Sequence, residues 1–497
     1  MANLIAQAKS TVAVPVEEEV VTNTAVTNTT QRSFEFDVIV LGGGPGGEPA
    51  ATRSAQLGKR VAIIERERLG GVCTNWGCIP TKALLRNAEL YESMIEAPKE
   101  WGITYDNLKF DFAKIIQRSR GVVDRNVRGI EYLMKKNKVE VISGNGVLTG
   151  KNSIEVTSKD GTKRTVTANS IVIATGARAR LLPGLKPDGK RILTAPEAMS
   201  MDHLPTSMTI VGSGAIGIEF AYFYHTLGTK VTIIEMMPNI LPVEDTEVSV
   251  ELEKLYKKKG LTIFTNTKVN GVTVDTGGTV VEIESADGKK EKIEAECTLI
   301  AIGVQGNTEN IGLEKLGIGM TKGFIDVNEN MQSSIPTIYA VGDVAGPPWL
   351  AHVATSEGIV AAEHIVLGKT HPVDYDNIPG CTYCQPQIAS VGLTERAAKD
   401  KGLKIKIGKF PFSASGKARA IGHTDGFVKL IFEEKYGELL GAHIIGAEAT
   451  EMLEELVLAR SHGATAESIL RTVHPHPTLS EAVMEAASVA LGEAIHL

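Results

Sequence analysis

Residues 34–65 read FEFDVIVLGGGPGGEPAATRSAQLGKRVAIIE, and this stretch decides the fold. An apolar run leads into Gly42, Gly44 and Gly47, a helical pattern follows, and a second apolar run ends on Glu65. In a strand–turn–helix context the first glycine permits a tight turn, the second lets the backbone approach a pyrophosphate, and the third lets the helix pack on the strand. The stretch therefore predicts a dinucleotide-binding unit.

The same plan returns 170 positions later, in residues 208–235, which read MTIVGSGAIGIEFAYFYHTLGTKVTIIE. Its glycines are Gly212, Gly214 and Gly217, and its acid, Glu235, again follows the first glycine by 23 positions. A carboxylate at this strand end accepts hydrogen bonds from ribose hydroxyls and repels a 2′-phosphate. No Arg or Lys stands in the MMPN that follows, so the second unit is predicted to bind NAD rather than NADP.

Length and composition describe an ordinary globular protein. The chain has 497 residues, 43% hydrophobic and 22% charged, with a net charge of −7. This length predicts roughly three or four domains. Without a basic cluster, nucleic acid is an improbable partner. No apolar run reaches the ~18 residues of a membrane span.

The start of the chain and the cysteine usage bear on location. Residues 1–33 are polar and acidic and lack a helical period, which predicts a disordered tail; an unrecognised targeting leader is the alternative. Five unevenly spaced cysteines do not form a disulfide framework. The prediction is a cytoplasmic protein.

The second half of the chain changes character. An apolar strand ends at Asp343, which either bonds a polyol or ribose or caps the following turn. From residue 376 onward, antiparallel strand patterns and helices predict a separate α+β domain. The predicted fold class is α/β with two Rossmann-like domains plus this C-terminal domain. The predicted boundaries are 1–33 for the tail, 34–180 with 305–375 for the first dinucleotide-binding domain, 181–304 for the second and 376–497 for the C-terminal domain.

Two of the cysteines, Cys73 and Cys78, lie five positions apart in GGVCTNWGCIPTK, residues 70–82. As a staple, so short a loop would stabilise a large domain little. Zinc would need two further ligands nearby, and none is found there. A dithiol that opens and closes remains, and two dinucleotide sites would give it an electron donor and an acceptor. Cys381 and Cys384 are interpreted as structural or incidental, and Cys297 as a core residue.

Thiol–disulfide chemistry needs a base, because the thiolate is the nucleophile. The segment HPHPTLSE, residues 474–481, offers His476 with Glu481 to hold its tautomer. Spacing alone favours the alternative, a surface histidine before a helix. Lys82 and Glu219 are separately ordinary charges, and together they would form an ion pair between the two dinucleotides.

Five blocks resemble the FAD-dependent pyridine nucleotide-disulfide oxidoreductases, and among them the dihydrolipoamide dehydrogenases. The resemblance covers the chain from Phe34 onward, in order and at family spacing. The blocks are GGVCTNWGCIPTKALL (70–85), GSGAIGIE (212–219), IYAVGDVAGPPWLAH (338–352), ASVGLTE (389–395) and HPHPTLSEA (474–482). The sequence departs from the usual pattern at Gln305-Gly306, Val353, Pro475 and the YCQPQ segment, which leaves the dithiol, the base and the glycines intact.

The resemblance implies that residues 34–180 with 305–375 form an FAD-binding domain, residues 181–304 an NAD-binding domain and residues 376–497 a dimerisation domain. It also implies two sets of cofactor-binding residues and no metal. FAD is expected on Gly42, Gly44, Gly47, Glu65, Lys82, Gly146, Thr175, Gly176, Ala177, Asp343, Leu350, Ala351 and His352. NAD is expected on Gly212, Gly214, Gly217, Glu219, Glu235, Val269 and Gly303.

The resemblance also implies a reaction. Cys73 meets a dihydrolipoyl dithiol, Cys78 lies against the flavin as the charge-transfer thiolate, and Lys82 beside the flavin pairs with Glu219. His476, oriented by Glu481, comes from the other subunit of an obligate homodimer. Electrons then pass from dihydrolipoyl groups through the disulfide and FAD to NAD⁺.

The implied partners are the lipoyl domains and core of a 2-oxo acid dehydrogenase or glycine cleavage complex. One alternative is a sister reductase of glutathione, of another small disulfide or of mercuric ion. Glu235 argues against NADPH, and GEAIHL at the end of the sequence carries no cysteine pair. The other alternative is a subunit that docks on a complex without turnover, against which the intact Cys73, Cys78, His476 and Glu481 count.

Overall fold

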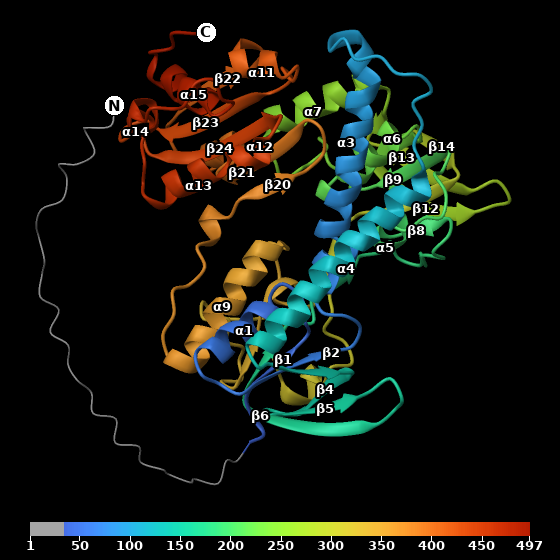
Figure 1. The fold of residues 1–497 in the computed structure, drawn as a ribbon, viewed down its shortest axis with the longest axis vertical. Helices are drawn as coiled ribbons and strands as arrows, with labels where there is room; N and C mark the ends of the chain where they lie inside the picture. The colour runs from blue at the N-terminus through green and yellow to red at the C-terminus, as the bar shows by residue number, and fades with distance from the viewer. Residues whose placement is uncertain (1–33) are drawn as a thin grey trace, which may run out of the picture.

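The computed structural model describes residues 34–497, so the predicted disordered tail lies outside the described part of the chain. The described residues form three units built on three large sheets, and Figure 1 shows the first at the bottom, the second on the right and the C-terminal one at the upper left. This arrangement confirms the predicted α/β class with an α+β C-terminal unit. The domain boundaries themselves remain predictions.

The first unit is a seven-stranded sheet in the order β3-β2-β1-β6-β5-β4, with β19 beside β6. Strands β3, β2, β1, β6 and β19 run parallel, and β5 and β4 extend β6 as an antiparallel flap. The apolar run at β1 is buried almost throughout, as expected for a parallel strand covered on both faces. The bounds are β1 Phe36–Leu41, β2 Val61–Glu65, β3 Glu140–Ser143, β4 Asn145–Gly150, β5 Ser153–Thr157, β6 Lys163–Ile173 and β19 Ile338–Ala340.

Helices α1 and α9 pack together on this sheet, and two long helices rise from it toward the other units (Figure 1). Their bounds are α1 Gly47–Gln56, α2 Gly71–Trp76, α3 Cys78–Glu100, α4 Phe112–Lys136 and α9 Ala351–Leu367. Helix α3 packs along both α4 and α6 (Ala215–Thr226), so it joins the first unit to the second.

The second unit is a parallel five-stranded sheet in the order β11-β10-β9-β15-β8, accompanied by an antiparallel sheet β12-β13-β14. Helix α6 is apolar nearly all round and lies in the largest hydrophobic cluster. The bounds are β8 Ile192–Leu193, α5 Ala195–Ala198, β9 Ser207–Val211, β10 Lys230–Ile234, α7 Thr246–Lys259, β11 Thr262–Phe264, β12 Thr267–Val274, β13 Thr279–Ser285, β14 Lys290–Ala295 and β15 Cys297–Ile300.

Short elements connect the two dinucleotide units. Strands β7 and β16 pair as the chain leaves and re-enters the first unit. The bounds are β7 Ala177–Ala179, β16 Val304–Gly306, α8 Leu313–Leu316, β17 Met320–Thr321, β18 Phe324–Ile325, η1 Gly342–Ala345 and η2 Tyr375–Asn377.

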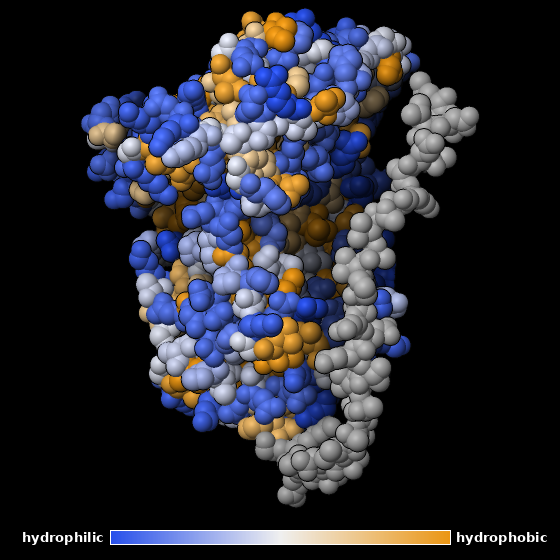
Figure 2. Space-filling view, turned by 90° about the vertical axis from the view of Figure 1, so that its left-hand side faces the viewer, coloured by the Kyte–Doolittle hydropathy of each residue, from blue (hydrophilic) through white to orange (hydrophobic). Residues whose placement is uncertain are grey.

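The C-terminal unit is an antiparallel sheet in the order β20-β21-β24-β23-β22, and α15 packs across β22 and β23. Figure 2 views the side of the molecule that carries this unit and α9, where polar residues dominate and a hollowed waist separates the upper and lower parts. The bounds are β20 Gly380–Thr382, β21 Gln387–Gly392, α10 Glu395–Asp400, β22 Ile405–Pro411, η3 Phe412–Ala414, α11 Gly416–Ala420, β23 Phe427–Glu433, β24 Leu439–Gly446, α12 Ala449–Met452, α13 Glu454–Ser461, α14 Ala466–Arg471 and α15 Glu481–Leu491.

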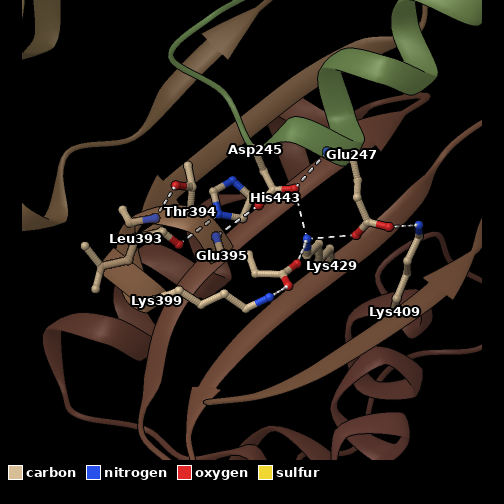
Figure 3. Close-up of polar contacts among 10 residues, drawn as sticks. Asp245, Glu247, Leu393, Thr394, Glu395, Lys399, Lys409, Lys429 and His443 are labelled. Carbon is tan, nitrogen blue, oxygen red and sulfur yellow. Dashed lines mark hydrogen bonds and ion pairs between the residues drawn. The ribbon is translucent and has the colours of Figure 1, made fainter. Parts of the chain in front are cut away.

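A buried ionic cluster fixes the second unit to the C-terminal unit (Figure 3). Lys429 of β23 has a side chain only 1% exposed, and its Nζ lies 2.9 Å from Asp245, 2.7 Å from Glu247 and 2.6 Å from Glu395. Asp245 caps α7 and also accepts a hydrogen bond from the Glu395 N–H at 3.0 Å. Burial alone would lower the pKa of Lys429, but the three carboxylates outweigh it and raise that pKa.

Replacing Lys429 with methionine would leave these carboxylates without their shared counter-charge. We expect the free energy of unfolding to fall by about 3–5 kcal/mol, as when one partner of a buried ion pair is removed. Lys399→Met removes a 63% exposed partner of the same Glu395, and here the expected loss is about 0–1 kcal/mol. Thermal unfolding followed by circular dichroism compares the two variants, and equal melting temperatures would contradict this account of the cluster.

Candidate active site

The first glycine turn has the geometry of a pyrophosphate cradle. Gly42 has φ +110°, and a Cβ added there would meet the Ala174 carbonyl oxygen at 2.2 Å. A Cβ on Gly47 would meet the Gly42 oxygen at 1.9 Å, so α1 approaches β1 closely only because this residue is glycine. A Cβ on Gly44 would meet only the Gly71 Cα, at 3.6 Å. Packing explains the first and third glycines, and the second presents open backbone at the start of a helix, where anions bind.

The second turn repeats this geometry. Gly212 has φ +98°, and a Cβ there would lie 2.3 Å from the Ala301 oxygen. A Cβ on Gly217 would lie 2.1 Å from the Gly212 oxygen, whereas a Cβ on Gly214 would have nothing within 4 Å. Because Gly214 is the N-cap of α6, the free N–H groups of that helix point toward the open space above the turn. Both turns fit a dinucleotide.

The acidic residue of the first unit, Glu65, is hydrogen-bonded to the first glycine turn. Glu65 accepts hydrogen bonds from the Gly43 N–H at 2.8 Å and from the Glu67 N–H at 2.7 Å. A cavity of about 380 Å³ opens beside it, with Arg68 and Met134 among the lining residues. The carboxylate therefore stands between the glycine turn and a cavity, where a ribose would lie.

The acid of the second unit is held in the same way. Glu235 accepts hydrogen bonds from the Ser213 N–H at 2.9 Å, the Ser213 hydroxyl at 2.7 Å and the Met237 N–H at 2.8 Å. Only 7% of Glu235 is exposed. Its position is thus set by the backbone of the turn that follows β9, which preorganises it for a ligand bound at Gly214.

The cysteine pair forms a disulfide next to the first glycine turn. Cys73 lies in α2, Cys78 begins α3, and their Cα atoms are 4.7 Å apart. The Gly70 N–H donates to the Gly43 oxygen at 2.6 Å, and a Cβ on Gly71 would meet the Gly44 Cα at 2.6 Å. The redox pair is therefore fixed against the backbone that would hold the first dinucleotide.

The Lys82–Glu219 ion pair links the two units. Lys82 Nζ lies one turn into α3 and donates to both carboxylate oxygens of Glu219, at 2.9 and 3.0 Å. Glu219 in α6 is 4% exposed and also accepts a hydrogen bond from the Tyr383 N–H at 3.0 Å. The Tyr383 ring lies 4.4 Å from Lys82 Nζ, which is cation–π range. A segment of the C-terminal unit therefore completes this contact.

Asp343 lies in the short helix η1 between β19 and α9. Burial raises the pKa of its carboxyl group. Beneath it, Glu357 of α9 accepts hydrogen bonds from the Gly342 N–H at 2.6 Å and the Tyr375 hydroxyl at 2.7 Å. Glu357 and Tyr375 hold the Asp343 turn and were not predicted from the sequence.

Four more residues expected at FAD lie at the start of β7 and in β4. Gly176 has φ +68° with open space at its Cβ position, and its neighbour Thr175 donates to the Asn307 oxygen at 2.8 Å; Ala177 begins β7. Gly146 packs inward, because a Cβ there would meet the Leu41 Cδ1 at 2.6 Å.

Three further residues expected at FAD lie at the start of α9. Two residues expected at NAD, Val269 and Gly303, belong to the second unit. Leu350 caps α9 and Ala351 begins it, while His352 Nε2 lies 2.9 Å from the Pro379 oxygen. Val269 packs in the hydrophobic clusters beside β12. Gly303 has φ +106° with open space at its Cβ position.

His476 and Glu481 meet at the C-terminal unit. His476 Nδ1 lies 2.8 Å from Glu481 Oε1, and the Thr478 N–H donates to the other carboxylate oxygen at 2.8 Å. Burial alone would raise the pKa of Glu481, but these two hydrogen bonds lower it. The His476 side chain is 80% exposed, and within one chain it lies in a different unit from the disulfide (Figure 1). Among residues 34–497, His476 Nε2 has no hydrogen-bond partner, because the contact with Glu481 uses Nδ1.

Known protein families match this geometry. A family model described as pyridine nucleotide-disulphide oxidoreductase matches residues 36–358, and the model of that family's dimerisation domain matches residues 378–487. The chain belongs to this family.

Curated relatives and solved structures agree with the assignment to the pyridine nucleotide-disulphide oxidoreductases. Dihydrolipoyl dehydrogenase of Zymomonas mobilis is 50% identical over 93% of this chain and 99% of its own, and that of Bacillus subtilis is 46% identical with the same coverage. The crystal structure of LpdA from Mycobacterium tuberculosis superposes with a TM-score of 0.83 at 28% identity, over 91% of this chain and 99% of that one. The flavoprotein disulfide reductase RclA of Escherichia coli gives a TM-score of 0.81 at 25% identity, with the same coverage.

The other cysteines of this family member are poor nucleophiles. Burial raises the pKa of Cys297 and Cys384 to about 12 and that of Cys381 to about 11, so all three stay protonated near neutral pH. Residues 34–497 contain no group of three or more His, Cys, Asp or Glu placed to hold a metal ion. Within the same range, no helix is both long and apolar enough to cross a membrane.

Proposed function

We propose that this chain is a dihydrolipoyl dehydrogenase that oxidises dihydrolipoyl groups through the Cys73–Cys78 disulfide and reduces NAD⁺. One observation carries the proposal: the disulfide lies against one glycine turn, and the Lys82–Glu219 pair connects its helix to the helix of the other turn. That arrangement supplies a route for two electrons between a dithiol and a nicotinamide. The relatives named dihydrolipoyl dehydrogenase support the substrate.

The reaction of the substrate dithiol with the Cys73–Cys78 disulfide is a thiol–disulfide exchange. His476 takes a proton from one substrate thiol, and the resulting thiolate attacks Cys73 and releases Cys78 as a thiolate. The second substrate thiol then displaces Cys73, which leaves with a proton, and the substrate becomes a cyclic disulfide. FAD, when bound at the first turn, supplies the two-electron redox chemistry between this dithiol and NAD⁺. Glu481 holds the His476 tautomer and stabilises its protonated form.

The partner subunit of a homodimer would bring His476 to the disulfide. Support comes from the match of the C-terminal unit to a dimerisation domain and from the exposure of His476. Large apolar side chains are also exposed on α9, on α13 and before α15: Ile359 by 37%, Leu458 by 60% and Val473 by 93%. We further assign the lipoyl domains and core of a 2-oxo acid dehydrogenase or glycine cleavage complex as partners, and the cytoplasm as location.

Glu235 should set the nucleotide preference. Glu235→Gln keeps the size of the side chain but removes the charge that accepts ribose hydroxyls and repels a 2′-phosphate. Hydrogen bonds to a charged group contribute about 1.5–3 kcal/mol, so we expect the dissociation constant for NAD⁺ to rise by about 10–100-fold. Fluorescence titration with NAD⁺ and NADP⁺ measures both constants. An unchanged preference between the two nucleotides would show that Glu235 does not contact the ribose.

The substrate is tested by following NADH at 340 nm with free dihydrolipoamide and NAD⁺. Parallel reactions contain NADP⁺ as acceptor, or oxidised glutathione with NADPH in the reverse direction. We expect turnover only with dihydrolipoamide and NAD⁺. Faster turnover of glutathione with NADPH would keep the disulfide chemistry and overturn both the substrate and the nucleotide assignment.

A further inference from the structure

We propose that Arg120 of α4 is a positioning residue that also provides the counter-charge for the thiolate formed when the Cys73–Cys78 disulfide is reduced. The proposal rests on the proposed function, because it assigns a residue to the redox step of that reaction. It concerns the loop that the disulfide closes, residues 73–78, which comprises the end of α2 and the start of α3; α2 packs against α4.

Arg120 holds this loop from one side. Its Nη1 donates to the Asn75 backbone oxygen at 2.9 Å, and its guanidinium lies 4.6 Å from the centre of the Trp76 ring. Asn75 is 5% exposed, and its side-chain amide donates to the Leu69 and Gly71 oxygens, both at 3.0 Å. The loop is therefore fixed by Asn75 to residues 69–71, which contact the first glycine turn, and by Arg120 to α4.

Among residues 34–497, no carboxylate lies within ion-pair distance of Arg120. Asp124, one turn further along α4, pairs with Arg68 at 2.8 Å, and both of those side chains are nearly half exposed. Arg120 Nε is buried and lacks a hydrogen-bond partner in the described chain. Burial is the main cause that lowers the pKa of this guanidinium. The negative charge of Asp124 raises that pKa, and the positive charge of Arg68 lowers it further. Arginine nevertheless remains charged in proteins.

The neighbouring pairs are neutral in sum. Lys82 is matched by Glu219 and Arg68 by Asp124, so Arg120 provides the excess positive charge at the loop. Beside the uncharged disulfide, this half-buried charge is offset only by Asp124, which itself pairs with Arg68, and its desolvation costs free energy. A thiolate in the loop would relieve that cost, and a nearby cation lowers the pKa of a thiol. The arrangement therefore favours the reduced state of the pair.

The test measures the redox equilibrium of the holoenzyme in anaerobic dithiothreitol buffers. Dithiothreitol closes to its cyclic disulfide as the Cys73–Cys78 bond breaks. Of its two thiol protons, one is taken up by one cysteine and the other passes to the buffer, so the second cysteine is left as a thiolate. Acid quench, alkylation and mass spectrometry then count the free thiols at the two positions. This readout requires neither dihydrolipoamide nor NAD⁺.

Arg120→Gln should shift the equilibrium about tenfold toward the disulfide, the size of one charge interaction in a partly buried setting, or ~30 mV for a two-electron couple. Arg120→Lys keeps the charge and should stay within about twofold of the parent. Asp124→Asn removes an opposing charge at a half-exposed position and should shift the equilibrium about two- to threefold toward the dithiol.

Shifts of opposite sign in Arg120→Gln and Asp124→Asn, with Arg120→Lys near the parent, would support the proposal. No shift, shifts of the same sign, or an equal shift in Arg120→Lys and Arg120→Gln would overturn the counter-charge. If Arg120→Gln does not fold, the test compares the redox equilibrium of Asp124→Asn with that of the parent. A shift toward the dithiol supports the proposal, and a shift toward the disulfide or an unchanged equilibrium overturns it. If the parent enzyme failed to oxidise dihydrolipoamide while these shifts appeared, the substrate assignment would fall and the role of Arg120 would stand.

Discussion

Cys78→Ser should lower the oxidation of dihydrolipoamide by NAD⁺ by at least about 10⁴-fold, on the scale seen when an enzyme loses its reacting group. Serine cannot form the disulfide that receives the electrons, so the exchange has no second sulfur. Cys78 begins α3, and its helix packs through other residues, so the variant should fold and keep its flavin spectrum. Steady-state NADH formation measures the loss.

Cys381→Ser is the matched control for this variant. Cys381 also lies among the partly buried cysteines, but its raised pKa keeps it a thiol, and it is not part of the redox pair. We expect parental turnover from it. Parental turnover from Cys78→Ser would instead mean that electrons bypass the disulfide.

His476→Gln should slow dithiol oxidation by about 10²–10⁴-fold, the usual contribution of a general base. Glutamine can still reach Glu481 but cannot take the substrate proton. Reduction of the enzyme by NADH does not need this base and should keep its rate, so stopped-flow measurements of the two half-reactions separate the base from a general defect.

His462→Gln provides the control, because His462 is another exposed histidine of the C-terminal unit, and its nearest partners are Ser461 and Leu458. Unchanged dithiol oxidation in His476→Gln would remove His476 from the reaction and return it to the surface-histidine interpretation.

The features predicted from the sequence are those that local geometry determines. Gly42 and Gly212 need positive φ, and Gly47 and Gly217 must let a helix approach a strand. Both turns could therefore be predicted from their glycine motifs. The anchoring of Glu235 follows from its place at the end of β10, at a fixed distance from the turn. These requirements lie within one βαβ unit.

Apart from the Lys82–Glu219 pair, contacts between distant segments were not predicted from the sequence. The Tyr383 N–H reaches Glu219 across 164 positions, and Lys429 reaches Asp245 across 184. Such contacts depend on how the units pack, which no local pattern encodes. Arg120 on Trp76 is a similar case at shorter range, since an arginine in an amphipathic helix is ordinarily a solvated charge. Gly146 is a different case. The family resemblance assigned it to FAD binding, and the structure gives a second reason for a glycine there, because a Cβ would collide with Leu41.

The central claim is that electrons from dihydrolipoamide pass through the Cys73–Cys78 disulfide before they reach NAD⁺. The most direct test mixes one equivalent of dihydrolipoamide per chain with the oxidised holoenzyme under anaerobic conditions and alkylates samples after acid quench. We predict free thiols at both cysteines before NAD⁺ is added, and their loss together with the appearance of one NADH per chain afterwards. NADH formed while both cysteines remain in the disulfide throughout would contradict the account.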